Sequence, residues 1–125
     1  MNTTEQQSCI FCKIIAGTIP SKIIAQNDQT LAIQDITPKA PIHYLIIPKT
    51  HIKDVSSLPN NMVNIPGELF MMAQKLALDL PGDKSFRLVV NNGAGAGQSV
   101  FHLHMHLLAG GFYSESSLCL PESQM

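Results

Sequence analysis

The chain has 125 residues, enough for one domain with a modest core. Its formal net charge of −1 and its 14% of charged residues give no basic surface for holding a nucleic-acid backbone, so we expect no nucleic-acid partner. The polar start has no apolar export signal, and no later run approaches the ~20 apolar residues of a membrane span. Three cysteines do not indicate a disulfide framework, and we expect a cytoplasmic protein with small-molecule ligands.

The first feature along the chain with possible chemistry is the pair Cys9 and Cys12. A gap of two residues lets two thiolates converge on one zinc ion. A redox pair is the alternative, but such pairs follow a strand, whereas this one opens the chain. Zinc needs two more ligands, and His51 and His102 are available. We therefore favour a structural zinc site of these four residues over free thiols.

Apolar residues at helical spacing predict a short helix that runs from the cysteine pair to Gly17. Residues 22–26 and 30–36 are rich in β-branched side chains, and Asn27 and Asp28 between them predict a hairpin. Asp35 ends the second strand. It could cap the following loop or accept hydrogen bonds from sugar hydroxyls, and the residue alone favours capping.

The middle of the chain predicts a strand over residues 43–49, a long helix over 65–80 and a strand over 85–91. Asn64 is the expected N-cap of the helix, and Pro66 suits its first turn. With a fifth strand over residues 101–108, the chain predicts an α+β fold. The antiparallel sheet would have about five strands, and the long helix would cover one face.

Residues 101–108 carry His102, His104 and His106, which alternate with apolar residues. Side chains of a strand alternate between its two faces, so all three imidazoles would share one face. In a helix each residue turns by about 100°, and the three rings would point in different directions. Imidazole binds metals and also supports nucleophilic and acid–base chemistry, so both interpretations remain open at this point.

The segment just before the histidines, residues 91–99, is a glycine-rich polar loop. Its glycines allow backbone N–H groups to approach an anion closely. The loop lacks the Lys-Ser/Thr ending of a Walker motif and the glycine spacing of a dinucleotide fold. A plain hairpin connection is the alternative for the loop alone. Joined to three histidines, and with the Gln98 amide and the Ser99 hydroxyl, it indicates a site for transfer of a phosphorus centre.

The histidine motif, followed by Leu107 and Leu108, resembles the histidine triad (HIT) family. Residues 10–15, 19–20, 35–43, 47–52 and 91–100 also resemble the Hint branch of that family, the histidine triad nucleotide-binding proteins. The resemblance covers about residues 8–111. We accordingly expect a disordered start over residues 1–8, a HIT domain over 9–111 and a C-terminal tail over 112–125.

The resemblance implies a purine nucleoside phosphoramidate hydrolase that needs no cofactor for its chemistry. His104 would attack the α-phosphorus and form a nucleotidyl-imidazole intermediate, from which water releases the nucleoside monophosphate. His106 would contact the phosphate and help to manage protons, while His43 would orient His104. Gln98, Ser99 and the glycine-loop backbone would hold the phosphate and leaving-group atoms.

The resemblance also implies the ligand contacts and the assembly. Asp35 would take the ribose hydroxyls, which replaces the capping interpretation, and Asn91 would face the phosphate or ribose. The Cys9, Cys12, His51 and His102 set would bind zinc, and two chains would join their sheets in a homodimer. The substrate-binding set comprises Asp35, Asn91, Gly97, Gln98 and Val100, together with an apolar purine slot of Ile10, Phe11, Ile14, Ile33 and Ile36.

The sequence departs from the Hint pattern in its tail, since the chain has no tryptophan where many members place one, and at Ile33, where an aromatic residue is common. Cys119 is expected to be a surface thiol. Two other functions remain open: a dinucleotide polyphosphate hydrolase or nucleotide transferase, and a noncatalytic nucleotide-binding or interaction module.

Overall fold

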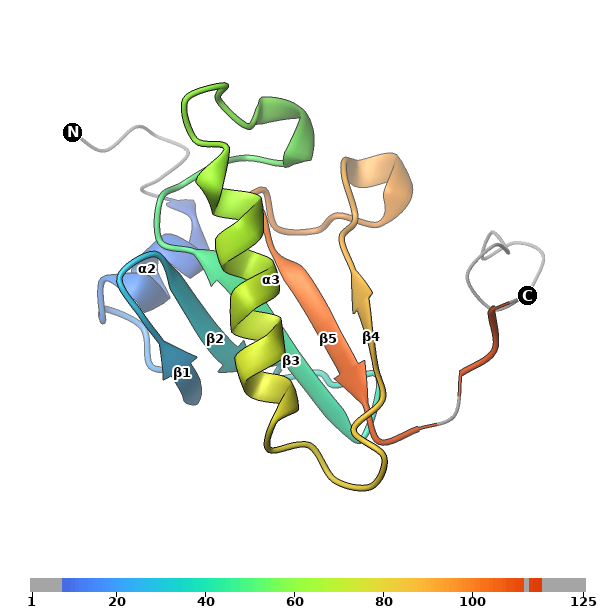
Figure 1. The fold of residues 1–125 in the computed structure, drawn as a ribbon. Helices are drawn as coiled ribbons and strands as arrows, with labels where there is room; N and C mark the ends of the chain where they lie inside the picture. The colour runs from blue at the N-terminus through green and yellow to red at the C-terminus, as the bar shows by residue number, and fades with distance from the viewer. Residues whose placement is uncertain (1–7, 112, 116–125) are drawn as a thin grey trace.

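The computed structural model describes residues 8–111 and 113–115. The expectations for residues 1–7, for Cys119 and for most of the tail lie outside these residues. Figure 1 shows the elements in chain order. They are α2 (Ile10–Ile15), β1 (Ile23–Gln26), β2 (Thr30–Gln34), β3 (Ile42–Pro48), η1 (Val55–Ser57), α3 (Asn64–Ala77), β4 (Phe86–Val89), η2 (Ala94–Ala96) and β5 (Met105–Ala109).

The five strands form one sheet in the order β1-β2-β3-β5-β4, and every neighbouring pair is antiparallel. The predicted α+β fold with an antiparallel sheet, one long helix and one short helix is confirmed. β5 contains His106, the last histidine of the motif. It lies between β3 and β4, so it is internal to the sheet. Within the described residues, no helix has the length and apolar character needed to cross a bilayer.

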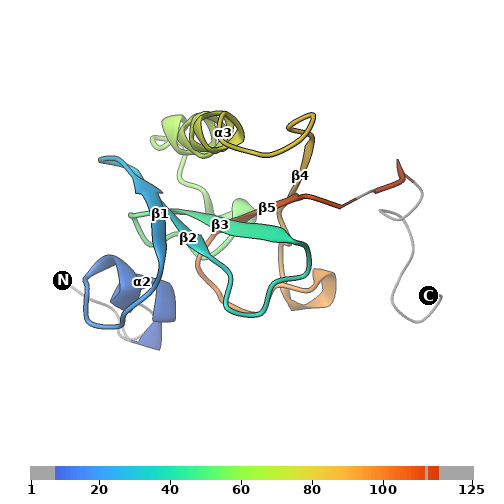
Figure 2. The same ribbon diagram turned by 90° about the horizontal axis from the view of Figure 1, so that it is seen from below.

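Helices lie on both faces of the sheet. Seen along the sheet in Figure 2, α3 lies on one face and α2 on the other. The α3 side packs Leu69, Met72 and Leu76 against sheet residues such as Ile46 and Leu107. The α2 side packs a second apolar cluster, which includes Phe11, Ile14, Leu31, Ile33 and Ile47. Burial on both faces explains why β2 and β3 are nearly continuous apolar runs.

The observed ends of the two helices agree with the predicted ends only in part. α2 stops before Gly17, which has φ +81°, as expected for a glycine after a helix. The predicted N-cap of α3 is wrong, because Asn64 is the first helical residue and the preceding Val63 makes no side-chain cap. α3 ends at Ala77 rather than at residue 80, and single turns continue the chain to Leu80.

The hairpin between β1 and β2 forms as expected. Asn27 Oδ1 accepts hydrogen bonds from the backbone N–H groups of Gln29 and Thr30, which closes the turn. β2 ends at Gln34, two residues earlier than predicted, because Asp35 begins a new turn. Its Oδ1 accepts hydrogen bonds from the backbone N–H and the hydroxyl of Thr37, so the capping role is present.

The histidine strand is shorter than predicted, since β5 begins at Met105. The pairing of β5 with β3 ends at this residue, where Met105 lies opposite Ile46. Beyond it, outside the ladder, the Leu103 N–H donates to the Ile52 carbonyl at 2.6 Å. Leu103, Met105 and Leu107 all lie in the α3-side core. The alternation therefore persists beyond the strand, and the histidines share the opposite face.

Candidate functional site

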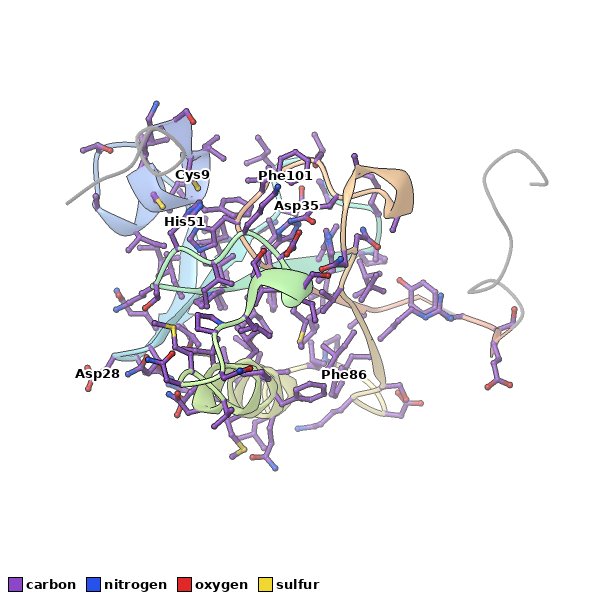
Figure 3. The ribbon with its side chains drawn as sticks, turned by 90° about the horizontal axis from the view of Figure 1, so that it is seen from above. Cys9, Asp28, Asp35, His51, Phe86 and Phe101 are labelled. Atoms are coloured by element: carbon purple, nitrogen blue, oxygen red, sulfur yellow. The ribbon has the colours of Figure 1, made fainter. Side chains whose placement is uncertain are left out.

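Seven of the predicted residues line one pocket of about 360 Å³: Asp35, His43, Asn91, Gly97, Ser99, His104 and His106. They come from β3, from β5 and the residue before it, from the loop after β2 and from the glycine loop after β4. In Figure 3 the labelled Asp35 marks this site, and the labelled Cys9 and His51 mark a separate cysteine–histidine cluster. The sheet thus brings together residues that are as far apart in the chain as Asp35 and His106.

His104 is held by the backbone of the motif itself. Its Nδ1 lies 2.7 Å from the carbonyl oxygen of His102. A carbonyl can only accept, so Nδ1 carries the hydrogen and Nε2 carries the lone pair of the neutral ring. The side chain is buried, and burial lowers the pKa of His104 below its usual 6.5. The ring is therefore neutral near pH 7 and has one unprotonated nitrogen.

His43 bonds to His106 rather than to His104, which corrects the expected pairing. Nδ1 of His43 accepts the backbone N–H of Lys39 at 3.0 Å, so Nε2 of the neutral ring carries the hydrogen. That Nε2 lies 2.9 Å from Nδ1 of His106, which must then accept. His106 in turn carries its own hydrogen on Nε2. The chain of bonds makes His106 a hydrogen-bond donor.

Both rings of this pair are neutral at neutral pH. Burial, and then the neighbouring His104 and His43, lower the pKa of His106 to about 4. Burial also lowers the pKa of His43, although the nearby Asp35 carboxylate opposes this shift. Asp35 Oδ2 lies 3.4 Å from His43 Nε2. Asp35 therefore both caps its loop through Oδ1 and faces the histidine pair through Oδ2.

The glycine loop is braced from inside by Gln98, which is buried. Its Oε1 accepts the Gly93 N–H, and its Nε2 donates to the carbonyls of Lys53 and Val100. The expected contact of the Gln98 amide with substrate is corrected, since the whole amide is committed to the protein. Gly97 has φ +99°, a conformation that favours glycine, and lies against the Asn91 side chain.

Cys9, Cys12, His51 and His102 converge as predicted, with their ligand atoms all within 4.8 Å of one another. Cys9 Sγ and Cys12 Sγ lie 3.4 and 3.6 Å from His102 Nδ1. Cys12 Sγ lies 3.2 Å from His51 Nδ1, and the two imidazole Nδ1 atoms are 3.2 Å apart. Tetrahedral zinc with ordinary bond lengths places such ligands about 3.3–3.6 Å apart.

The protonation of the cluster also fits a metal ion. His102 Nε2 donates to the Pro48 carbonyl at 2.8 Å, so its Nδ1 is the unprotonated nitrogen and faces the cluster. Burial, and then the Cys9 thiol, raise the pKa of Cys12 to about 12, so without a cation the Cys12 thiol would stay protonated. A divalent cation would stabilise two thiolates beside two lone pairs.

The residues expected to form the purine slot lie in different parts of the structure. Phe11, Ile14 and Ile33 are buried in the α2-side cluster. Ile36 is 89% exposed and is not gathered with them. Ile10 and Val100 line a second pocket of about 510 Å³, together with Lys53, Ser99 and Phe101. The Phe11 ring reaches the site through edge contacts with His102 and His104.

Sequence reasoning missed several residues of the two pockets. Thr37 and Lys39 line the histidine pocket, and Lys53 and Phe101 line the second one. Thr37 and Lys39 stand in the proline-containing segment after Asp35, where only the chain path was considered. No local pattern marks Lys53, because it reaches the second pocket only through the fold.

Comparison with known proteins gives the family. The HIT domain model matches residues 16–112. An uncharacterised HIT-like protein of Synechocystis sp. is 43% identical over 104 residues, covering 83% of this chain and 91% of that protein. The adenylylsulfatase HINT1 of Arabidopsis thaliana is 37% identical over 110 residues, covering 86% of this chain and 75% of that protein.

Solved structures agree with these matches. A HIT family hydrolase of Legionella pneumophila has a TM-score of 0.81 and 38% identity, covering 86% of this chain and 97% of that one. A zinc-bound histidine triad family protein of Mycobacterium smegmatis has a TM-score of 0.70 and 32% identity, covering 82% of this chain and 75% of that one. By its matched domain, its relatives and its fold, the chain belongs to the HIT family.

Proposed function

We propose that this protein is a hydrolase that cleaves the P–N bond of purine nucleoside 5′-phosphoramidates through a nucleotide covalently bound to His104. One observation carries the proposal. The pocket holds an unprotonated nitrogen on His104 and a hydrogen-bond donor on His106, and the two ring centroids are 5.1 Å apart. A nucleophile beside a donor is what displacement at a phosphate requires.

His104 acts as the nucleophile. Its Nε2 attacks the α-phosphorus, a P–N bond to the imidazole forms, and the bond to the leaving amine breaks. The ring needs no general base, because its lone pair is already available, and the bond from Nδ1–H to the His102 carbonyl stabilises the positive charge that develops on the ring. Water then attacks phosphorus, forms the new P–O bond and releases His104.

His106 donates its Nε2–H to a nonbridging phosphate oxygen, where negative charge must be stabilised. His43 is a positioning residue, since it keeps Nδ1 of His106 as an acceptor. Ser99 lines the same pocket and donates the proton that the departing nitrogen needs. The water of the second step returns one proton, so the site ends in its starting state.

The remaining pocket residues bind the nucleotide. Asp35 accepts hydrogen bonds from the ribose, Asn91 faces the phosphate or ribose, and the backbone near Gly97 and Val100 approaches the phosphate closely. Apart from Ile10, which lines the second pocket, the apolar residues of the expected purine slot supply contacts for the base where their edges reach the site. Support comes from geometry, since Asp35, Asn91 and Gly97 surround the same pocket as His104.

We propose that Cys9, Cys12, His51 and His102 hold a structural zinc ion, with no part in the bond-breaking steps. The four ligand atoms and their spacing support it, as does the zinc-bound relative of Mycobacterium smegmatis. We also propose a cytoplasmic homodimer with a sheet continued across the two chains. Light scattering after size exclusion measures that assembly.

The experiment is a substrate panel with the purified protein. Adenosine 5′-phosphoramidate is compared with diadenosine polyphosphate and with adenylyl sulfate, because one relative is named an adenylylsulfatase. His104→Ala is run beside the wild type. We expect fast phosphoramidate cleavage that disappears in the variant while the variant still binds AMP.

The covalent step has its own measurement. Rapid quenching in base, followed by peptide mass spectrometry, should find a nucleotide on His104, because a phosphorus–imidazole bond survives base but not acid. Wild-type turnover by His104→Ala would reject the nucleophile. Turnover of none of the substrates with retained AMP binding would reject the enzyme and favour a nucleotide-binding module.

A further inference from the structure

We propose that the second pocket receives the leaving group of the substrate, and that Lys53 selects leaving amines that carry a carboxylate on an apolar body. The proposal rests on the function proposed above and adds a substrate class to it. It begins from one shared residue, since Ser99 lines both the histidine pocket and the second pocket.

The direction of the substrate follows from the positions of Ser99 and Asp35. With phosphorus at His104 and the ribose at Asp35, the leaving nitrogen lies beside the hydroxyl that protonates it. Because Ser99 also belongs to the second pocket, the rest of the leaving group extends past it into a volume of about 510 Å³. That volume suits an amino-acid-sized group.

Two exposed apolar side chains form part of the wall of the second pocket. Ile10 is 42% exposed and Phe101 is 44% exposed, and both line this pocket. Exposed apolar side chains that meet in a concavity provide contact for an apolar ligand. An aromatic or branched amine would cover both.

Lys53 gives this pocket its charge. Its ammonium group lies 5.8 Å from the centre of the Phe101 ring, above the apolar wall. Among the described residues, the ion pair found is that of Asp35 and His43, so none of their carboxylates neutralises Lys53. The Oδ1 of neighbouring Asp54 accepts hydrogen bonds from the backbone N–H and the hydroxyl of Ser57. A ligand carboxylate would meet this cation with no competing carboxylate from the described residues.

The adjacent cysteine–histidine cluster does not cancel this charge. Cys9 lines the second pocket, but with a divalent cation bound, two thiolates and two neutral imidazoles would have no net charge. The Lys53 backbone is also fixed relative to the glycine loop, since its carbonyl accepts a hydrogen bond from Gln98 Nε2 at 2.9 Å. The ammonium group therefore extends from a backbone that is tied to the phosphate-binding loop.

The test compares two substrates that differ in one charge: the adenosine 5′-phosphoramidates of L-phenylalanine and of L-phenylalaninamide. Unsubstituted adenosine 5′-phosphoramidate is the reference. Lys53→Gln and Lys53→Glu are measured beside Lys75→Gln, a control on the exposed face of α3, on the other side of the sheet. The quantity compared is the ratio of kcat/KM for the carboxylate substrate to that for the carboxamide.

We expect the wild type and Lys75→Gln to favour the carboxylate by about three- to five-fold, the size expected of an exposed charge pair. Lys53→Gln should bring the ratio to about one, and Lys53→Glu should invert it. Raising the salt from about 0.05 M to about 0.5 M should weaken the wild-type preference, since it shortens the screening length.

Three outcomes would overturn the proposed leaving-group subsite or its selectivity for a carboxylate. The first is an unchanged ratio in Lys53→Gln. The second is an equal rise in KM for all three substrates in Lys53→Gln. Such a rise would mean that the second pocket holds the nucleoside and not the leaving group. The third is a wild-type ratio of one together with cleavage of the reference, which rejects the selectivity while the proposed function stands. Failure to cleave even the reference compound rejects the proposed function itself, so the two failures are distinguishable.

Discussion

His43 Nε2 lies 2.9 Å from His106 Nδ1, although the two residues are 63 positions apart in the chain. β3 and β5 bring them together, with His43 opposite Leu108 and His106 opposite Leu45 in the ladder. The bond fixes which nitrogen of His106 carries a hydrogen. A residue that does not need to touch substrate thereby sets the chemistry of one that does.

Removal of His43 should therefore impair the chemical step. We expect His43→Ala to lower kcat for adenosine 5′-phosphoramidate by on the order of 100-fold, with a smaller change in KM, because His106 loses its fixed tautomer. His43→Gln keeps an N–H donor at this position and should recover part of the rate. Nitrogen-15 NMR of the His106 ring reports the tautomer directly. Wild-type kcat in His43→Ala would contradict the assignment.

The stability of the protein should fall as the pH drops below about 6.5. In the folded state burial lowers the pKa of His106 to about 4, whereas the unfolded ring has the usual 6.5. The unfolded state therefore binds more protons between these values, and stability that is complete above pH 6.5 is lost as the pH falls towards 4. The loss attributable to this ring is up to about 3 kcal/mol.

Urea unfolding at pH 7, 6 and 5 measures this loss. His106→Asn is the matched control, because it has no group that titrates in the range and leaves the cysteine–histidine cluster intact. The variant should lose less free energy of unfolding than the wild type between pH 7 and pH 5. Parallel losses in the two proteins would show that His106 is not the group responsible.

Gln98 should tolerate loss of its amide better than conversion to a carboxylate. Gln98→Ala removes three hydrogen bonds and should cost about 1–3 kcal/mol of unfolding free energy. Gln98→Glu keeps the acceptor for the Gly93 N–H but turns a second oxygen towards the carbonyls of Lys53 and Val100. A buried negative charge against two carbonyl oxygens is worse than a missing group, so this variant should unfold at lower urea. If Gln98→Glu were more stable to urea than Gln98→Ala, the bracing role of the Gln98 amide would be contradicted.

Removal of metal should loosen α2 first. Protein purified from zinc-containing medium should hold about one zinc ion per chain by elemental analysis. Chelation should lower Tm by at least about 5 °C and speed hydrogen exchange of the α2 amides, while those of α3 stay protected, because Cys9 and Cys12 attach α2 to the sheet. Cys12→Ser should have the same effect.

The proposed metal site should also influence the proposed nucleophile, His104. His102 supplies both a cluster nitrogen and the carbonyl that holds His104 Nδ1, and Phe11 packs against both rings. Loss of metal should therefore shift the His104 ring resonances in NMR spectra. Metal-free protein with unchanged α2 protection and unchanged His104 resonances would reject a structural role for the ion.

The sequence by itself determined the features that depend on local pattern. The alternation of histidine with apolar residues puts His104 and His106 on one face and Leu103, Met105 and Leu107 in the core. This follows from side-chain periodicity alone, and it holds even where the ladder has ended. The cysteine spacing likewise predicted a metal-type cluster, because its ligand set is defined by residue chemistry.

Only the tertiary structure decided the rest. The start of β5, the pairing of His43 with His106, the inward turn of Gln98 and the position of Lys53 at the second pocket each depend on contacts between distant segments. A buried polar group satisfies its hydrogen bonds with whatever the fold brings near it, and the sequence around the residue does not name that partner.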